Sequence, residues 1–162
     1  MATISEAKAQ YLLDQYIAAQ TQATEQAIQA YAEKVKAQLA AEEEQTADKA
    51  QETTQDTSAA YDKHTVQALV ARRNAMESLA NRGLTRSGLA QHTKTSIARQ
   101  KQVADNAAAI KGRQTLTTLQ KNLEQAKRNA QAQISEHAAS ARKTLNQKIA
   151  EKELTLFKNV EV

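Results

Sequence analysis

The sequence predicts an all-α fold: an elongated helical hairpin or coiled-coil bundle that is oligomeric, with a short extended tail as a candidate C-terminal element. Three observations predict it. The 162-residue chain has no proline and only three glycines, so few residues interrupt a helix. Aromatic residues make up 3% of the chain, too few for a large globular core. The larger apolar residues recur at spacings of three and four, the period of an amphipathic helix.

The chain is expected to form a single elongated unit over residues 1–162. Its helices are expected to span about 4–42, 57–81 and 86–152. The first helix carries one apolar stripe, made of Leu13, Ile17, Ile28, Tyr31, Val35 and Leu39. Thr3 or Ser5 is expected to cap its start. Glu6 is favourable in the first turn, because the amino end of a helix attracts negative charge.

Residues 42–58 contain no large apolar side chain, and two interpretations remain open for them. The stretch is either a solvated continuation of the first helix or a connector. In the second case, the Thr, Asp and Ser residues at 53–58 provide the cap of a new helix. The apolar stripe resumes beyond this stretch with Tyr61, Val66, Leu69, Val70, Met76 and Leu79.

A tight bend is predicted at residues 82–87, near two of the three glycines. Gly83 is expected at the position just past the helix end, in left-handed backbone geometry that glycine adopts without steric cost. Leu84 then follows it and packs on Leu79, which completes a Schellman helix end. The two helices that flank the bend are expected to fold back on each other as a hairpin.

The final helix is expected to start directly after this bend. Thr85 is the expected N-cap, and Ser87 is the alternative. With Thr85 as the cap, Leu84 and Leu89 form a hydrophobic staple. Gly88 falls in the first turn, where its missing side chain permits close approach of another chain or of the preceding helix. The expected bend and interface residues are therefore Leu79, Gly83, Leu84, Thr85, Ser87, Gly88 and Leu89.

The final helix contains a heptad seam, in which the spacings alternate between three and four. Its members are Leu116, Leu119, Leu123, Ala126 and Ala130. Gly112 follows three alanines and marks either a close helix crossing or a tolerated glycine. In the tail, residues 154–162, apolar and polar residues alternate, which is typical of a strand. A frayed helix end is the alternative for the tail.

Patterns that would carry catalysis are missing. Gly83 and Gly88 have the glycine spacing of a phosphate-binding loop, but Leu89 and Ala90 follow where that loop needs Lys and Ser or Thr. Ser87 lacks the preceding glycine of a nucleophile elbow. No two histidines are close enough in sequence to bind a metal from one helix; they are His64, His92 and His137. The sequence therefore predicts a non-catalytic protein with no cofactor, no metal site and no membrane span.

Charge is distributed unevenly along the chain. Residues 1–62 hold 4 Lys and 11 Asp or Glu, a net charge of −7. The net charge of the whole chain is +4, so residues 63–162 have a net charge of +11. One interpretation is pairing of an acidic helix with a basic one, within the chain or between subunits. The other is binding of nucleic acid by the basic part. The candidate anion or nucleic-acid contacts are Arg72, Arg73, Arg82 and Arg86.

Residues 72–102 resemble a segment found in small helical virion proteins of tailed bacteriophages. In that segment a helix leads into an A-x-x-GLT-x-SG bend, followed by a long helix rich in Ala, Gln and Lys. The matching positions are Ala80, Gly83, Leu84, Thr85, Ser87 and Gly88. The resemblance implies a non-catalytic virion component, assembled in the host bacterial cytoplasm as an oligomeric part of the neck, tail tip or fibre attachment. Its partners would be further copies of itself and other virion proteins.

Two alternative functions remain open. The first is an internal or ejected virion protein that associates with DNA through the basic C-terminal part of the chain. The second is an amphipathic protein that coats an apolar surface with helical hairpins. With no Trp and one Phe, the chain has little side-chain area for insertion into such a surface.

Overall fold

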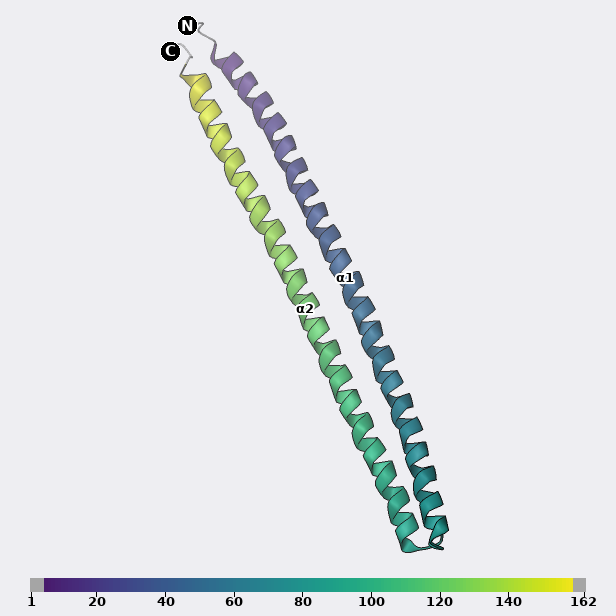
Figure 1. The fold of residues 1–162 in the computed structure, drawn as a ribbon. Coiled ribbons are helices and arrows are strands. Elements are labelled where there is room, and N and C mark those ends of the chain that lie inside the picture. Colours follow the sequence, from purple (N-terminus) through teal and green to yellow (C-terminus); the bar gives the residue numbers. More distant parts are fainter. Residues whose placement is uncertain (1–4, 159–162) are drawn as a thin grey trace. The chain divides into compact units, whose positions relative to one another are not determined.

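The chain folds into two α-helices that follow each other in sequence (Figure 1). In the computed structural model, which describes residues 5–158, α1 spans Glu6–Asn81 and α2 spans Gly88–Phe157. Residues 5–158 contain no β-strand. At the start of α1, the carbonyl of Ser5 accepts hydrogen bonds from the backbone of Lys8 and Ala9. The predicted all-α class and helical hairpin are confirmed.

Of the two interpretations of residues 42–58, the structure shows the helical continuation, because α1 runs through them without interruption, so the expected helix bounds at 42 and 57 do not hold. The hydroxyls that were expected to cap a new helix bond within the existing one. Thr53 Oγ1 donates to the carbonyl of Lys49, and Thr57 Oγ1 donates to the carbonyl of Thr53, each at 2.8 Å. Ala, Gln, Glu and Lys, which are common here, are good helix formers. The stretch therefore needs no apolar stripe of large side chains to remain helical.

The end of α2 also differs from the prediction. Helix was expected to stop near residue 152, but α2 continues through Leu154 to Phe157, and the Lys158 amide still donates to the Leu154 carbonyl at 3.2 Å. Alternation over so few residues does not distinguish a strand from the end of a helix. The remaining part of the predicted tail, residues 159–162, lies outside the described residues.

Contacts between the helices divide the chain into two compact units, where the sequence predicted one. Unit one combines the residues up to Glu42 with those from Glu124 onward, and unit two is Glu43–Leu123. Unit two is the hairpin itself, with the turn. In unit one, the amino-terminal part of α1 pairs with the carboxyl-terminal part of α2. Both units are antiparallel helix pairs, so each buries its stripe against a helix of the same chain.

The less exposed positions of both helices repeat every 11 residues. In α1 one such series is Leu13, Thr24, Val35, Thr46, Thr57, Ala68 and Leu79. In α2 it is Ala90, Lys101, Gly112, Leu123, Ile134, Leu145 and Leu156. Eleven residues in three turns correspond to about 3.67 residues per turn, close to the natural period of the helix. Of the predicted heptad seam, Leu119, Leu123, Ala126 and Ala130 are half-buried, whereas Leu116 is 36% exposed.

Unit one has an apolar seam. Its buried side chains are Ala9, Leu13, Ile28, Val35 and Leu145. The rings of Tyr31 and His137 stack across the seam, with centroids 3.9 Å apart. At its edge, the Arg142 guanidinium donates two hydrogen bonds to the Glu25 carboxylate, at 3.1 and 3.3 Å, and this contact raises the pKa of Arg142. One contact of the predicted kind, acidic α1 with basic α2, is thus present in unit one.

Candidate functional site

The turn of unit two ends α1 as the sequence predicts. Gly83 has a φ of 70°, in the left-handed region. The Gly83 amide donates to the Ala80 carbonyl at 2.9 Å, and the Leu84 amide donates to the Leu79 carbonyl at 2.8 Å. These are the two bonds of a Schellman motif, and Leu79 is 6% exposed beneath it.

The start of α2 differs from the preferred prediction. Ser87 is the N-cap: its Oγ accepts a hydrogen bond from the Ala90 amide at 3.3 Å, and its carbonyl accepts from the same amide at 3.1 Å. Thr85 cannot be the cap, because residues 85–87 form a second turn before the helix, closed by a bond from the Ser87 amide to the Leu84 carbonyl. The predicted hydrophobic staple between Leu84 and Leu89 depends on Thr85 as the N-cap, so it is wrong as well. Leu89 is 47% exposed.

Close approach of the helices occurs at Gly112 and not at Gly88. A Cβ atom on Gly88 would meet no atom within 4 Å, whereas one on Gly112 would lie 2.6 Å from Thr57 Oγ1 of α1. Gly112 is also buried. Of the two interpretations of Gly112, the close helix crossing is confirmed, whereas the preceding helix does not approach Gly88.

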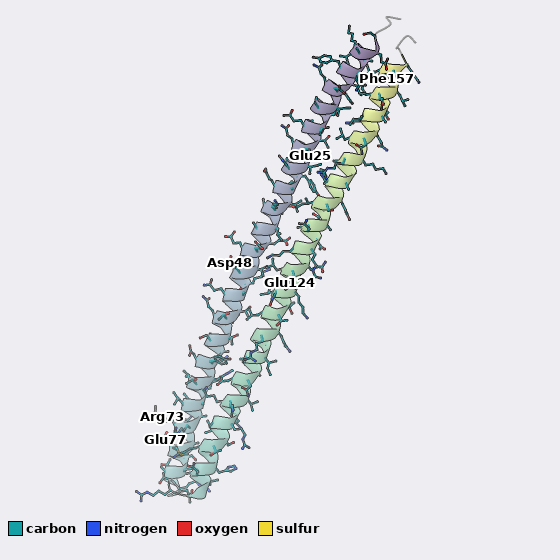
Figure 2. The ribbon with its side chains drawn as sticks, turned by 180° about the vertical axis from the view of Figure 1, so that it is seen from behind. Glu25, Asp48, Arg73, Glu77, Glu124 and Phe157 are labelled. Atoms are coloured by element: carbon teal, nitrogen blue, oxygen red, sulfur yellow. The ribbon has the colours of Figure 1, made fainter. Side chains whose placement is uncertain are left out.

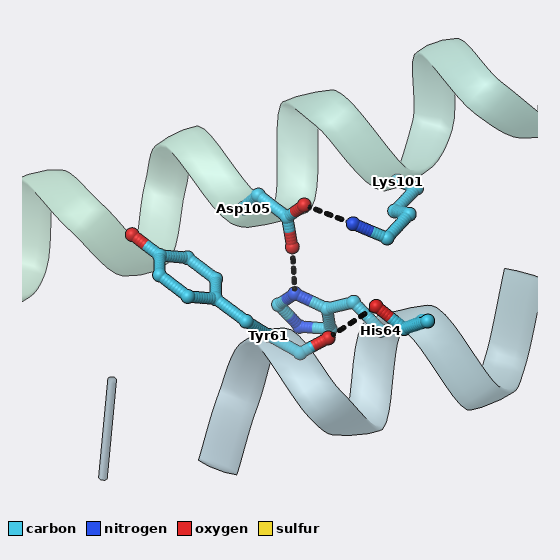
Figure 3. A network of polar contacts seen from close by, with 5 residues as sticks. Tyr61, His64, Lys101 and Asp105 are labelled. Atoms are coloured by element: carbon cyan, nitrogen blue, oxygen red, sulfur yellow. Dashed lines mark hydrogen bonds and ion pairs between the residues drawn. The ribbon is translucent and has the colours of Figure 1, made fainter. Parts of the chain in front are cut away.

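A polar network joins the two helices of unit two (Figure 3). His64 Nδ1 of α1 lies 2.9 Å from Asp105 Oδ1 of α2, and Lys101 Nζ lies 2.5 Å from Asp105 Oδ2. The hydrogen bond from Lys101, together with that from His64, lowers the pKa of Asp105 below its ordinary value. Because Lys101 and Asp105 are one turn apart on α2, the carboxylate is fixed in place to receive the His64 ring.

The rest of the seam of unit two mixes small and polar residues with large apolar ones. On α1 its half-buried positions include Thr46, Ala50, Thr53, Thr57, Ala60 and Ala68. Leu79 is buried, and Tyr61, Met76, Ile97, Leu119 and Leu123 are half-buried. Seven large apolar side chains of the same unit are exposed instead. On α1 the exposed ones are Val66 (60%), Leu69 (61%) and Val70 (52%). On α2 the corresponding residues are Leu89, Val103, Ile110 and Leu116. Unit two therefore exposes as many large apolar side chains as it buries or half-buries.

The four candidate arginines are all exposed. Arg72 and Arg73 are in α1, where consecutive residues point about 100° apart, and Figure 2 shows Arg73 on the side away from α2. Arg82 and Arg86 are in the turn. None of the four has an ionic partner within residues 5–158. The structure places them along one end of unit two without gathering them into one cluster.

The remaining candidate chemistry can be placed as well. His64 is in the seam of unit two, His137 stacks on Tyr31 in unit one, and His92 is exposed. Across the part of the chain that the structure covers, no group of three or more His, Cys, Asp or Glu side chains is arranged to hold a metal ion. No helix in that part is long and apolar enough to cross a membrane.

Comparison with protein-family models, curated proteins and solved structures found no match. Function is therefore argued from the residues of the chain itself. Sequence reasoning missed two features of unit two: the Lys101–Asp105–His64 network and the packing of Thr57 on Gly112. The first had a local signal, a Lys and an Asp four residues apart, but the pairing across the helices depends on the alignment set by the turn. The second follows from the 11-residue spacing, which passes through Thr57 and Gly112.

Proposed function

We propose that the chain is a non-catalytic structural subunit of a bacteriophage particle. It assembles through its long helices as an oligomeric part of the neck, tail tip or fibre attachment. Assembly is supported by the arrangement of unit two, and the particle is suggested by the resemblance of residues 72–102 to small helical virion proteins. The two parts of the proposal are separate and are tested separately.

The observation that carries the assembly is the exposure of large apolar residues on the outer faces of unit two. Val66, Leu69 and Val70 lie on α1 within five consecutive residues, and each is more than half exposed. Burial of such a side chain is worth about 1.5–3 kcal/mol. Contiguous apolar surface on a protein marks an interaction site. The seam of unit two leaves these residues uncovered, so they are available for burial against another molecule.

Light scattering on the purified chain tests assembly. We expect a particle mass several times 17.8 kDa, together with a mostly helical circular dichroism spectrum. A 17.8 kDa species at every concentration would contradict it. For the second part, an antibody to the chain should label particles purified from the organism that encodes it. Particles without the chain would contradict a virion role while leaving the assembly intact.

Association with DNA is the second candidate function, and one observation favours it. Seven basic residues between 63 and 99 have no ionic partner within the described chain: Lys63, Arg72, Arg73, Arg82, Arg86, Lys94 and Arg99. Only one acidic residue, Glu77, lies among them. Phosphate contacts of this kind are independent of base sequence and weaken steeply with salt.

Fluorescence anisotropy with labelled duplex DNA tests this candidate. Replacement of Arg72, Arg73, Arg82 and Arg86 by Gln should abolish binding at low salt and flatten its salt dependence. A control that removes the same charge elsewhere, at Arg128, Lys143, Lys148 and Lys158, should bind DNA nearly as the natural chain does. Absence of binding by the natural chain at low salt would reject the candidate.

Coating of an apolar surface is the remaining alternative. The exposed residues Val66, Leu69 and Val70, followed by Arg72 and Arg73, are compatible with a helix on a membrane surface. Flotation with anionic liposomes should then carry the chain to the top of the gradient. If the protein stays at the bottom, this alternative is rejected.

A further inference from the structure

The outer face of α1 in unit two combines apolar and charged residues in a symmetric order. Asp62, Val66, Leu69 and Arg73 follow at spacings of four, three and four, so they share one side of the helix. All four are exposed. We call this set, with Val70 at its edge, the α1 outer face. Its two apolar residues are flanked by an acid on one side and a base on the other.

The longer charge pattern of α1 has the same order, apart from Lys49 and Lys63 in its acidic part and Glu77 in its basic part. The exposed acids Glu44, Asp48, Glu52, Asp56 and Asp62 precede the apolar residues. The exposed bases Arg72 and Arg73 follow them, and Arg82 and Arg86 come next in the turn. None of these residues has an ionic partner within residues 5–158. Figure 2 shows Asp48 and Arg73 on the same side of α1.

The acidic and basic runs cannot pair with each other within one molecule. They belong to one continuous helix, and the 11 residues from Asp62 to Arg73 span about 16 Å along it. A second copy that lies antiparallel brings the two runs together. Its acidic run then faces the basic run of the first copy, and the reverse holds at the other end.

We propose that the α1 outer face binds the same face of a second copy in an antiparallel dimer, with a two-fold axis between Val66 and Leu69. Each Val66 then packs against Leu69 of the other copy, and each Asp62 faces Arg73 of the other copy. The interface is isologous, so every contact occurs twice. A parallel pair is disfavoured, because it would bring Asp62 against Asp62 and Arg73 against Arg73.

This inference rests on the proposed assembly and gives it a surface and an orientation. A charge exchange tests the surface. Asp62→Arg alone or Arg73→Asp alone should weaken the dimer roughly tenfold in sedimentation equilibrium, because two symmetry-related pairs change from attraction to repulsion. The double variant Asp62→Arg/Arg73→Asp should restore the affinity, since the facing charges are opposite again.

A matched control separates the facing pair from net charge. Arg99→Asp makes the same charge change as Arg73→Asp, at an exposed residue of α2 that also lacks an ionic partner. It should leave the affinity nearly unchanged. If the natural chain is oligomeric but the double variant does not recover, or if Arg99→Asp weakens association equally, the α1 dimer is wrong and the assembly stands. A monomeric natural chain rejects both.

Distance measurements test the orientation. The chain has no cysteine, so single nitroxide labels can be attached through Gln51→Cys or Ser58→Cys. In the antiparallel dimer, the two copies of a label move apart along the helix by about 3 Å for each residue that separates the label from the two-fold axis. The expected distance between the two labels is about 50 Å at position 51 and about 28 Å at position 58. Pulsed electron paramagnetic resonance should show the longer distance at position 51. Equal distances at both positions would indicate a parallel pair and overturn the proposal.

Discussion

At the scale of single residues, Gly83 and Gly88 have different requirements although they lie five residues apart. Gly83 has a φ of 70°, whereas Gly88 begins α2 and has open space where a Cβ would be. Gly83→Ala should cost about 1–2 kcal/mol, because left-handed geometry crowds a Cβ atom, and Gly83→Val should cost more. Gly88→Ala should be neutral or stabilise by up to about 1 kcal/mol. Urea unfolding followed by circular dichroism measures both, and equal effects would contradict the assigned turn.

Asp105 makes the stability of unit two depend on pH. Its pKa is lowered in the folded chain by hydrogen bonds from Lys101 and His64. Its carboxylate therefore stabilises the fold at pH values above 3.8, the ordinary pKa of an aspartate. That contribution disappears as the pH falls through the lower, folded pKa. Asp105→Asn should therefore be less stable than the natural chain near pH 6 and should approach it at strongly acid pH.

The measurement is urea unfolding at several pH values, with Asp48→Asn as the control. Asp48 is exposed and has no ionic partner among the described residues. Its variant should stay close to the natural chain across the range. A constant difference between Asp105→Asn and the natural chain at all pH values would show that the carboxylate charge is not responsible.

At the scale of elements, the sequence allowed prediction of the turn better than of the helices. Gly83, Leu84 and Leu79 have local roles, so their order alone revealed the Schellman end. The choice between Thr85 and Ser87 as the cap depended on the second turn, which leaves no local signal. The continuity of α1 remained one of two open interpretations, because Thr46, Thr53 and Thr57 occupy its seam positions where large apolar residues would have marked a helix. The partners of these threonines lie on α2, so the seam could not be predicted from the sequence of either helix alone.

The contact of Thr57 with Gly112 provides a test of that pairing. Gly112→Ala should gain about 1 kcal/mol from helix propensity, but its Cβ would meet Thr57 Oγ1, which is held by a hydrogen bond to the Thr53 carbonyl. The gain should therefore appear in full only in a Thr57→Ala background. A double-mutant cycle by urea unfolding should show coupling of about 1 kcal/mol. Simple additivity would mean that these residues do not face each other.

At the scale of the whole molecule, assembly should contribute to thermal stability. Leu79 is the one large apolar side chain of unit two that is fully buried, whereas the outer face of α1 leaves Val66 and Leu69 available to another copy. Because an oligomer is stabilised by mass action, the Tm should rise with protein concentration. Val66→Ser/Leu69→Ser should remove most of this concentration dependence while leaving the helix content of the dilute protein unchanged. A Tm that does not change over a hundredfold range of concentration would contradict the assembly.

The 11-residue spacing also limits how such a chain changes length. Removal of residues 47–57 from α1 and 112–122 from α2 deletes the same three turns from each helix. Thr46 and Ala68 then become 11 residues apart, as do Lys101 and Leu123 after the deletion, so each surviving seam position keeps its partner. Removal of seven residues from each helix would instead rotate one part of the stripe away from the other by about 33°, because seven residues at about 3.67 per turn fall short of two full turns. Lineages that lengthen or shorten this hairpin are therefore expected to do so in paired steps of eleven residues. The variant that lacks residues 47–57 and 112–122 should remain helical by circular dichroism.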